Sequence, residues 1–325
     1  MRARATLGGV GLYLPARLVT NAELAGTVDT TDAWIVERTG IRRRYFAHAE
    51  ETTADLAIHA ARAVLTNAAV PGAAVDLTIV ATATAEYAFP SVAARVQGAL
   101  GLAGGAMDIS AACSGFVYGL AQAAALVQAE MAETVLVIGA EVFSRVLDWR
   151  DRATCVLFGD GAGAAVVRRS TLPGLPAAFV LGADGAQGQV LTLPSGAGLR
   201  AGPGHSSPTP LRMQGPEVYR FGVRAIVEGT RAVLARAGLG LDEVRWLVPH
   251  QANQRMLDAG AARLGLDPRR VVSTVAEYAN TAAASIPMAL ATQDERGLLR
   301  DGDRLALIGF GGGLSWGAGM IGWRD

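Results

Sequence analysis

Short apolar runs alternate with longer alanine-rich segments along this chain, and the alternation constrains the fold more than any other feature. The apolar runs are rich in β-branched residues and cover 76–84, 134–142, 244–251 and 304–310. Runs of this kind, without polar residues at every second position, are typical of strands covered on both faces. The segments with helical periodicity are 53–69, 90–101, 114–131, 216–237, 253–264 and 282–299. Alternating strands and helices predict an α/β fold.

The order of these elements occurs twice. A helix, a strand, a helix and a strand follow one another between residues 53 and 142, and again between 216 and 310. The sequence RRSTLPGLP interrupts the pattern between them, so we predict two halves, residues 1–172 and 173–325. Segment 194–210 is rich in glycine, proline and serine and is predicted to be a loop. It is either a mobile cover over a site or an insertion.

Composition excludes several classes of protein. The 325 residues are 51% hydrophobic, which is enough for a large core. Acidic and basic residues number 29 each and no basic run occurs, so we expect no nucleic-acid binding. All 29 basic residues are arginines, so any phosphate contact is made by a planar guanidinium. The N-terminal segment lacks a signal-peptide core and no run reaches ~18 apolar residues, so we expect a cytoplasmic protein without membrane insertion.

Cys113 is the first candidate for chemistry. With Cys155 it makes two cysteines, too few for a disulfide framework or a zinc cluster. In MDISAACSGFVYGLAQ an apolar run leads through small residues into a helical segment, which predicts that Cys113 lies at a helix N-terminus. Free N–H groups and the helix dipole favour a thiolate there. A buried structural cysteine is the plainer interpretation, and it is the one that we give Cys155.

Three other segments carry candidate groups. His250 ends an apolar strand in VPHQANQRM, where catalytic residues often occur. Asn280 precedes an alanine-rich helix in EYANTAAAS, and its amide can donate to a developing oxyanion. The glycines 311–313 let the backbone approach a ligand closely. Taken singly, these are equally a loop histidine, a turn asparagine and a tight turn.

In this order, the segments strongly resemble the type III ketoacyl-acyl carrier protein synthases of the thiolase superfamily, over nearly the whole chain. The segments that carry the resemblance are TDAWIVERTGIRRR (31–44), AFPS (88–91), DISAACSGF (108–116), FGDGAGAAV (158–166), VPHQAN (248–253), NTAAASIP (280–287) and GFGGGLSWG (309–317). The resemblance implies a thiolase-like five-layered αβαβα fold with two pseudo-repeated halves. It also implies a decarboxylative condensation of an acyl group, acetyl by default, from acyl-coenzyme A with malonyl-acyl carrier protein, which initiates fatty acid synthesis. No cofactor or metal is implied, since acyl-coenzyme A is a substrate.

The resemblance assigns catalytic roles residue by residue. Cys113 is the nucleophile that carries the acyl group. His250 and Asn280 stabilise the enolate that forms when the malonyl group loses carbon dioxide. The backbone N–H groups of Cys113 and Gly312 form the oxyanion hole.

It also assigns binding roles. Trp34 and Arg152 sandwich the adenine of coenzyme A, Arg38 lies beside its nucleotide phosphate, and Asn253 lines the pantetheine channel. The acyl pocket has Met213 near it and receives Phe89 from the partner subunit of a homodimer. Three arginines are implied to receive the carrier protein: Arg220, Arg255 and Arg263. A solvated helix face is the alternative interpretation for these arginines.

Two positions and two functions are left open. Ala279 stands where the family usually has glycine, and its methyl group could tighten the channel or shift Asn280. Whether Arg212 points inward is not determined by the sequence. An alternative function is that of a pathway-specific starter-unit enzyme or acyltransferase of secondary metabolism. A type III polyketide synthase, which accepts malonyl-coenzyme A directly, is a weaker one.

Overall fold

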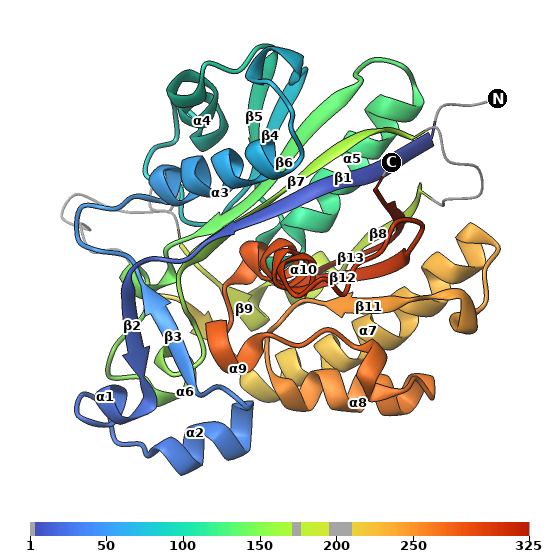
Figure 1. The fold of residues 1–325 in the computed structure, drawn as a ribbon. Helices are drawn as coiled ribbons and strands as arrows, with labels where there is room; N and C mark the ends of the chain where they lie inside the picture. Colours follow the sequence, from blue (N-terminus) through green and yellow to red (C-terminus); the bar gives the residue numbers. More distant parts are fainter. Residues whose placement is uncertain (1–3, 171–176, 195–209, 325) are drawn as a thin grey trace.

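The computed structural model describes residues 4–170, 177–194 and 210–324. Nine strands form one twisted system in the order β11-β12-β13-β1-β7-β6-β4-β5, with β8 added on β13 (Figure 1). The strands are β1 (Arg4–Tyr13), β4 (Leu77–Ala81), β5 (Gly105–Ile109), β6 (Thr134–Glu141), β7 (Gly161–Ser170), β8 (Ala177–Ala183), β11 (Trp246–Pro249), β12 (Arg304–Gly311) and β13 (Ser315–Trp323). β1 and β13 pair at just two positions, Thr6 with Gly322 and Leu7 with Trp323. The system therefore divides into two sheets joined along a short seam.

The two sheets repeat one arrangement. β4 and β6 run parallel, as do β11 and β12. β6 pairs antiparallel with β7, as β12 does with β13, and β7 pairs antiparallel with β1, as β13 does with β8. The predicted repetition of element order is therefore present in the topology. The predicted boundary between residues 172 and 173, and residues 195–209 of the predicted loop, lie outside the described residues.

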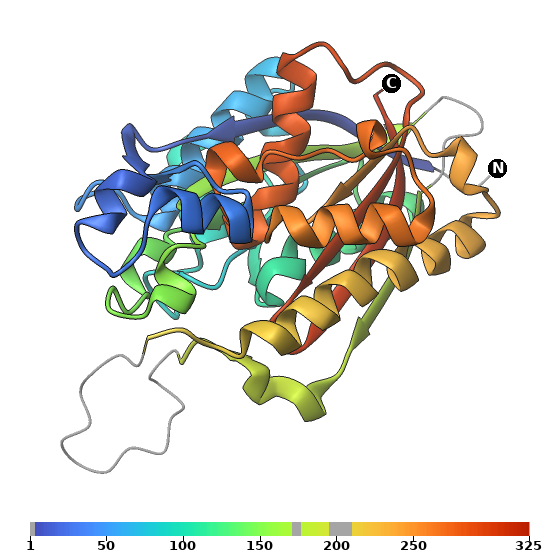
Figure 2. The ribbon, with the colours of Figure 1, turned by 90° about the horizontal axis from the view of Figure 1, so that it is seen from below.

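Helices form three layers around the two sheets. The long ones are α3 (Thr53–Asn67), α4 (Val92–Leu100), α5 (Gly115–Gln128), α7 (Gly215–Ala237), α8 (Gln254–Leu264) and α10 (Ser285–Glu295). α5 and α10 lie between the sheets and contact strands of both. α3 and α4 cover the outer face of the first sheet, and α7 and α8 cover that of the second (Figures 1 and 2). The five-layered αβαβα order predicted from the sequence is confirmed.

All four predicted strands and all six predicted helices are present within a few residues of their expected bounds. The sequence did not predict β13 as a strand, and this strand, like β7, is rich in glycine and alanine. Their composition follows from close packing against the central layer. A Cβ atom on Gly163 would lie 2.6 Å from the backbone nitrogen of Met288 in α10. Small residues are required there, so the β-branched signature of a strand is lost.

A smaller unit at the N-terminal side of the chain carries Trp34. It comprises β2 (Arg17–Thr20), α1 (Asn21–Ala25), α2 (Asp32–Thr39) and β3 (Arg43–Phe46). α2 begins at Thr31, whose side chain accepts a hydrogen bond from the Trp34 N–H, and ends at Gly40 in the left-handed conformation. The buried Arg44 donates to the side chain of Asn21 and to the carbonyl of Val156, both at 2.7 Å. These bonds attach β3 and the start of α1 to the body of the fold.

Within the described ranges, no helix is both long and apolar enough to cross a membrane. The same residues contain no cluster of histidine, cysteine and carboxylate side chains that could hold a metal ion.

Candidate active site

Cys113 lies at the start of the central helix α5. It belongs to the 3₁₀ turn η2 (Ala112–Ser114), which runs directly into α5, and it is 6% exposed. Gly311, at the end of β12, faces this turn: a Cβ atom there would lie 2.9 Å from both the Cβ and the backbone nitrogen of Cys113. The sulfur therefore has the helix N-terminus behind it and a bare backbone in front of it. The predicted placement at a helix N-terminus is confirmed.

His250 follows β11 and is 1% exposed. Its backbone N–H donates to the carbonyl of Ile308 in β12 at 2.7 Å, which extends the parallel pairing of the two strands. Its ring lies edge-on to Phe310, with 5.1 Å between centroids. Burial lowers the pKa of His250 to about 3, so the imidazole is neutral at ordinary pH.

The Nδ1 side of the His250 ring is paired with Ser285. Nδ1 lies 2.6 Å from the hydroxyl oxygen of Ser285, the first residue of α10. That oxygen also accepts a hydrogen bond from the Gln251 N–H at 3.3 Å. In the tautomer in which Nδ1 accepts from the Ser285 hydroxyl, the single proton of the neutral ring is on Nε2. His250 in this tautomer offers an N–H donor at its far side.

Asn280 precedes the turn η7 (Ala282–Ala284), which leads into α10, and is 6% exposed. Its backbone bonds to Leu157 and Gly159 at 3.0 Å each. Its side-chain oxygen accepts from the Ala282 N–H at 2.9 Å, which fixes the plane of the amide and leaves the NH₂ group facing away from the turn. η7 contacts η2, so Asn280 and Cys113 lie on neighbouring turns. β12, which pairs with the strand of His250, contacts η2 as well.

Ala279, which stands where glycine was expected, has φ 58° and ψ −158°. This region is populated almost only by glycine, so an alanine here carries local strain. Its side chain is buried in a cluster with Ile35, Cys155 and Val275. The methyl group therefore packs into this cluster, and the consequence of the replacement is backbone strain beside Asn280.

Gly312 follows β12 next to the turn of Cys113. A Cβ atom on it would lie 3.5 Å from the Cβ of Ala112 and 3.2 Å from the carbonyl of Leu191. The Ser315 hydroxyl lies 2.7 Å from the Gly312 carbonyl and 2.9 Å from the Ser114 hydroxyl, which ties the glycine segment to the start of α5. The two predicted oxyanion-hole residues are thus adjacent in space.

The thiol of Cys113 is less acidic than the sequence predicts. Burial, and after it the nearby Glu141 carboxyl group, raise the pKa of Cys113 to about 12. A helix N-terminus lowers a thiol pKa, but enclosure by the second half of the molecule removes the water that would solvate a thiolate. The resting form is therefore the thiol.

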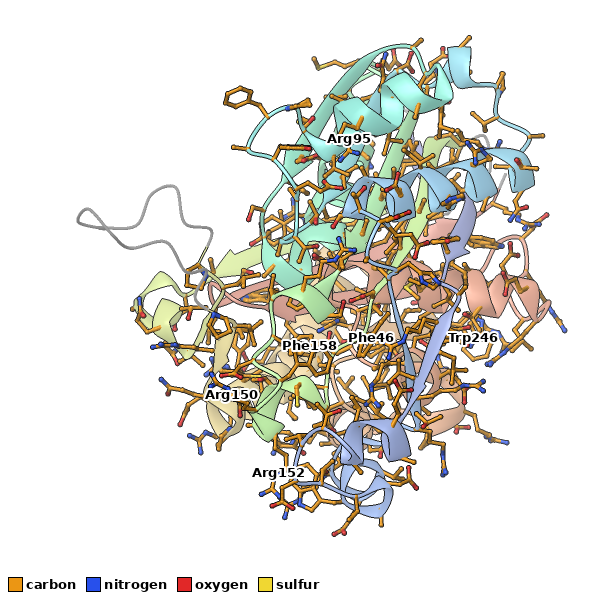
Figure 3. The ribbon with its side chains drawn as sticks, turned by 90° about the vertical axis from the view of Figure 1, so that its left-hand side faces the viewer. Phe46, Arg95, Arg150, Arg152, Phe158 and Trp246 are labelled. Carbon is orange, nitrogen blue, oxygen red and sulfur yellow. The ribbon has the colours of Figure 1, made fainter. Side chains whose placement is uncertain are left out.

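An apolar cluster surrounds the sulfur. Its buried members are Cys113, Phe143, Leu147, Phe158, Leu211 and Ala282. Phe143 and Phe158 are stacked, with ring centroids 4.8 Å apart and 9° between planes, and Phe158 lies in the interior above Arg150 and Arg152 (Figure 3). Met213, predicted near the acyl pocket, packs against this cluster, whereas Arg212 beside it is exposed.

Comparison with known proteins agrees with this geometry. The family described as 3-Oxoacyl-[acyl-carrier-protein (ACP)] synthase III matches residues 107–191, and its C-terminal counterpart matches 234–323. The β-ketoacyl-[acyl-carrier-protein] synthase III of Rhodospirillum rubrum is 50% identical, covering 98% of this chain and 99% of that protein. The enzyme of the same name from Rhodobacter capsulatus is 47% identical over 99% of this chain and 100% of that protein. The chain belongs to the β-ketoacyl-acyl carrier protein synthase III family.

Solved structures agree on the fold. The synthase III of Thermus thermophilus superposes with a TM-score of 0.91 at 45% identity, covering 98% of this chain and 99% of that one. The priming β-ketosynthase of the R1128 polyketide pathway gives 0.93 at 36% identity, with 100% and 97% covered. The thiolase-like fold is confirmed. As a synthase III, the chain is a condensing acyltransferase that initiates fatty acid synthesis, as predicted.

The predicted coenzyme A residues of this synthase III form a second group on the surface. The guanidinium carbons of Arg152 and Arg38 lie 4.8 and 5.0 Å from the ring centroid of Trp34. Asn253 donates to the carbonyl of Arg38 at 3.1 Å, and its side-chain oxygen accepts from the Arg255 N–H to cap α8. The four predicted residues are therefore neighbours in space, although they come from three distant segments.

The predicted docking arginines are all exposed. Arg220 on α7 forms an ion pair with Glu217. Arg255, in the first turn of α8, lies with its guanidinium carbon 6.0 Å from the ring of Tyr219, and Arg263 occupies the last turn of α8. α7 and α8 contact each other, so Arg220 and Arg255 share one side of the molecule.

Phe89 lies apart from the sulfur within this chain. It is 86% exposed in the loop between β4 and α4, and Tyr87 beside it is exposed as well. The next strand, β5, forms the edge of the first sheet. An exposed aromatic pair beside an open strand edge is a candidate contact surface.

Sequence reasoning missed the residues that support the site. Ser285 and Glu141 were not singled out, and neither were the pocket residues Phe143 and Phe158. Phe158 and Ser285 lie inside the resembling segments 158–166 and 280–287 without having been given a role, and Glu141 and Phe143 lie outside these segments. The one available signal is that Ser285 begins a helix five residues after Asn280.

Proposed function

We propose that Cys113, His250 and Asn280 carry out both half-reactions of the condensation, with acyl-coenzyme A and malonyl-acyl carrier protein as substrates. The observation that carries this proposal is the pairing of the buried His250 with Ser285 through Nδ1, and from it we assign the ring proton to Nε2. Such a ring is a donor and not a base. Together with the Asn280 amide it suits a reaction that generates an oxyanion without removing a proton.

In the first half-reaction the Cys113 sulfur attacks the thioester carbonyl of acyl-coenzyme A. The bond between that carbonyl carbon and the coenzyme A sulfur breaks, and the Cys113 thiol proton leaves with the coenzyme A thiol. The N–H groups of Cys113 and Gly312 are proposed to hold the oxyanion, since Gly311 leaves the space before the Cys113 nitrogen empty of side chains.

In the second half-reaction the malonyl group loses carbon dioxide, and the electron pair of the broken C–C bond forms an enolate. The His250 Nε2–H and the Asn280 NH₂ group donate to the enolate oxygen, and each donor lowers the barrier by about 3 kcal/mol. The enolate carbon attacks the acyl carbonyl, the bond to Cys113 breaks, and the thiolate takes up one proton. The product is 3-oxoacyl-acyl carrier protein, and no metal or cofactor takes part.

The pocket beside the sulfur favours a short starter, with acetyl as the proposed one. The stacked rings of Phe143 and Phe158 fill the apolar cluster around Cys113, and Leu147 and Leu211 close it further. An acyl chain longer than a few carbons would have to displace one of these buried rings, at a cost typical of core overpacking. Likeness to the R1128 priming ketosynthase keeps a pathway-specific starter as the second candidate.

Coenzyme A is proposed to enter past Trp34. Two guanidinium groups already flank the indole, so the cationic and aromatic groups that an adenine nucleotide needs are gathered here, and Arg152 would have to move off the ring for adenine to stack between them. The carrier protein is proposed to dock on the side of α7 and α8 that presents Arg220, Arg255 and Arg263, because carrier proteins bear a phosphopantetheine group and these side chains are cationic.

We further propose a cytoplasmic homodimer that pairs across the β5 edge. Among the residues that the structure describes, no strand pairs with the outer side of β5. Its one acidic residue, Asp108, accepts hydrogen bonds from the N–H groups of Val92 and Ala93 at the start of α4. The exposed Phe89 ring would then enter the partner's acyl pocket. Light scattering tests this: Phe89→Asp should give a monomer, and a dimer unchanged in this variant would rule out the Phe89 contact.

Intact-mass analysis tests the main proposal. The protein is incubated with acetyl-, butyryl- and octanoyl-coenzyme A, with Cys113→Ala as control and Phe143→Leu as an enlarged pocket. We expect an acetyl adduct on the wild type, longer adducts on Phe143→Leu, and none on Cys113→Ala. Release of carbon dioxide from malonyl-acyl carrier protein then separates a condensing enzyme from a simple acyltransferase. An adduct that persists in Cys113→Ala would remove Cys113 from the mechanism.

A further inference from the structure

The two central helices begin in the same way. η2 leads into α5 and η7 leads into α10, and the first residue of each turn, Ala112 or Ala282, has φ 45°. Each turn packs on the sixth residue of an eight-residue strand, where no side chain fits. A Cβ on Gly309 would lie 2.9 Å from the Cα of Ser114, and one on Gly139 would overlap the carbonyl of Ala283. Cys113 in the first turn therefore corresponds to Ala283 in the second.

The strands β12 and β6 end in different residues, a glycine in one and a glutamate in the other. β12 ends in Gly311, which leaves the space in front of the Cys113 N–H open. β6 ends in Glu141, which is 0% exposed. The N–H of Ala283 acts on its carboxyl group and lowers the pKa of that group, and the turn of Ala283 packs on β6. In the second turn, the place that the oxyanion occupies in the first is thus filled by a side chain of the protein.

The Glu141 carboxyl group accepts from three further donors. The Ala83 N–H lies 3.1 and 3.2 Å from its two oxygens, and the hydroxyls of Thr84 and Thr82 lie at 2.8 and 3.3 Å. Because one group binds both the start of α10 and the loop after β4, it joins two segments that are about 200 residues apart.

We propose that Glu141 is a positioning residue for Asn280. The Asn280 side chain and the Glu141 carboxyl group accept from consecutive N–H groups of one turn, those of Ala282 and Ala283. When both N–H groups have partners, the turn η7 is held in one orientation. The Asn280 side-chain amide, which donates to the enolate, is then held in that orientation too. Without Glu141, the Ala283 N–H is a buried donor without its acceptor, and the turn moves to satisfy it.

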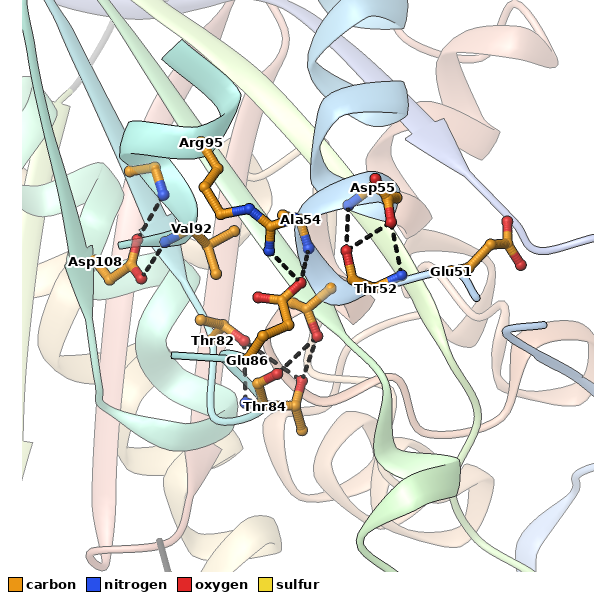
Figure 4. Close-up of polar contacts among 12 residues, drawn as sticks. Glu51, Thr52, Ala54, Asp55, Thr82, Thr84, Glu86, Val92, Arg95 and Asp108 are labelled. Carbon is orange, nitrogen blue, oxygen red and sulfur yellow. Dashed lines mark hydrogen bonds and ion pairs between the residues drawn. The ribbon is translucent and has the colours of Figure 1, made fainter. Parts of the chain in front are cut away.

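The loop after β4 that bonds to Glu141 is also bonded to the start of α3. The Thr53 hydroxyl donates to the Thr84 carbonyl at 2.7 Å. Two residues on, Glu86 accepts from the Ala54 N–H at 2.8 Å and pairs with Arg95 at 2.9 Å (Figure 4). The loop that carries Phe89 is therefore fixed to the first turn of α3 just beyond the Glu141 contact.

The test separates the two half-reactions in Glu141→Ala, with Glu133→Ala, an exposed glutamate directly before the other end of the same strand, as matched control. Decarboxylation of malonyl-acyl carrier protein depends on Asn280, and we expect it to fall about 100-fold, the usual effect of a misplaced group. Acylation of Cys113 from acetyl-coenzyme A does not depend on Asn280, and we expect its rate to fall less than about three-fold. Formate, which fits the vacated space, should restore decarboxylation at least about five-fold.

This inference rests on the proposed function, so the wild type is measured first. A wild type that neither acylates Cys113 nor releases carbon dioxide refutes the proposed function, whatever Glu141 does. Equal loss of both half-reactions in Glu141→Ala, or no loss, overturns the positioning role alone. If Glu141→Ala does not fold, Glu141→Gln takes its place, because it keeps the volume and one acceptor oxygen. Decarboxylation about ten-fold lower with acylation unchanged supports the role in that variant, and wild-type decarboxylation overturns it.

Discussion

The Nδ1 atom of His250 and the hydroxyl oxygen of Ser285 lie 2.6 Å apart in the closed interior between the two central helices. With the Ser285 hydroxyl donating to Nδ1, as we propose, the ring proton is on Nε2 and the histidine is a hydrogen-bond donor. The contact also joins two elements of the fold, because His250 directly follows β11 and Ser285 is the first residue of α10.

Ser285→Ala should therefore impair decarboxylation selectively. Without the hydroxyl, the ring can adopt either tautomer and can rotate. We therefore expect kcat for carbon dioxide release to fall about ten-fold, the size of loss that is typical when a functional histidine loses the partner that orients its ring. Acylation of Cys113 should change less than about two-fold. Ser273→Ala, which removes an exposed serine bonded to Gln254, is the control. Decarboxylation at the wild-type rate in Ser285→Ala would show that other contacts set the tautomer.

Burial of His250 also predicts how stability depends on pH. Unfolded, this side chain takes up a proton near its ordinary pKa of 6.5, whereas folded it stays neutral down to about pH 3. Its contribution is complete above pH 6.5 and is lost as the pH falls toward 3, with a slope of at most ~1.4 kcal/mol per pH unit.

Glu141 acts in the opposite sense. Burial raises its pKa from 4.5 to about 8, so its contribution is complete below pH 4.5 and is lost as the pH rises through 8. Urea unfolding of the wild type and of His250→Gln at pH 5 and pH 6 separates the two effects. The wild type should gain more stability between pH 5 and pH 6 than the variant does. Equal gains would mean that His250 is protonated in the folded protein.

The position of some functional residues could be predicted from the sequence, whereas that of others could not. Cys113 could be placed at a helix N-terminus, because small residues between an apolar run and a helical run have few other structural meanings. Its high pKa could not be predicted, since it depends on enclosure by the second half of the chain. Glu141 ends a buried strand, and nothing in the sequence indicates that the Ala283 N–H lies opposite it. The two halves could be recognised from element order, but the glycine-rich strand β13 could not.

Ala279 offers a test of stored strain. The backbone there has φ 58° and ψ −158°, a conformation that costs an alanine on the order of 1–3 kcal/mol. Ala279→Gly should raise the free energy of unfolding by about 1 kcal/mol after the loss of the buried methyl group and the added chain entropy are subtracted. Ala262→Gly, on the exposed face of α8, should lower it by about 1 kcal/mol. Urea denaturation compares both variants with the wild type. A loss of stability in Ala279→Gly equal to that in the control would mean that the backbone is relaxed.

Arg255 offers a test of the proposed docking surface for the carrier protein. Its side chain is exposed beside Tyr219 on the side shared by α7 and α8, while the backbone N–H next to it is held by Asn253. Arg255→Glu reverses a charge at the proposed docking surface, and rim charges of this kind act mainly on association. We expect KM for malonyl-acyl carrier protein to rise about ten-fold, with acylation from acetyl-coenzyme A unchanged. Arg236→Glu, in the last turn of α7, should leave both unchanged. If Arg255→Glu slows acylation as much as condensation, the arginine serves the entrance for both substrates, and the carrier protein must dock elsewhere.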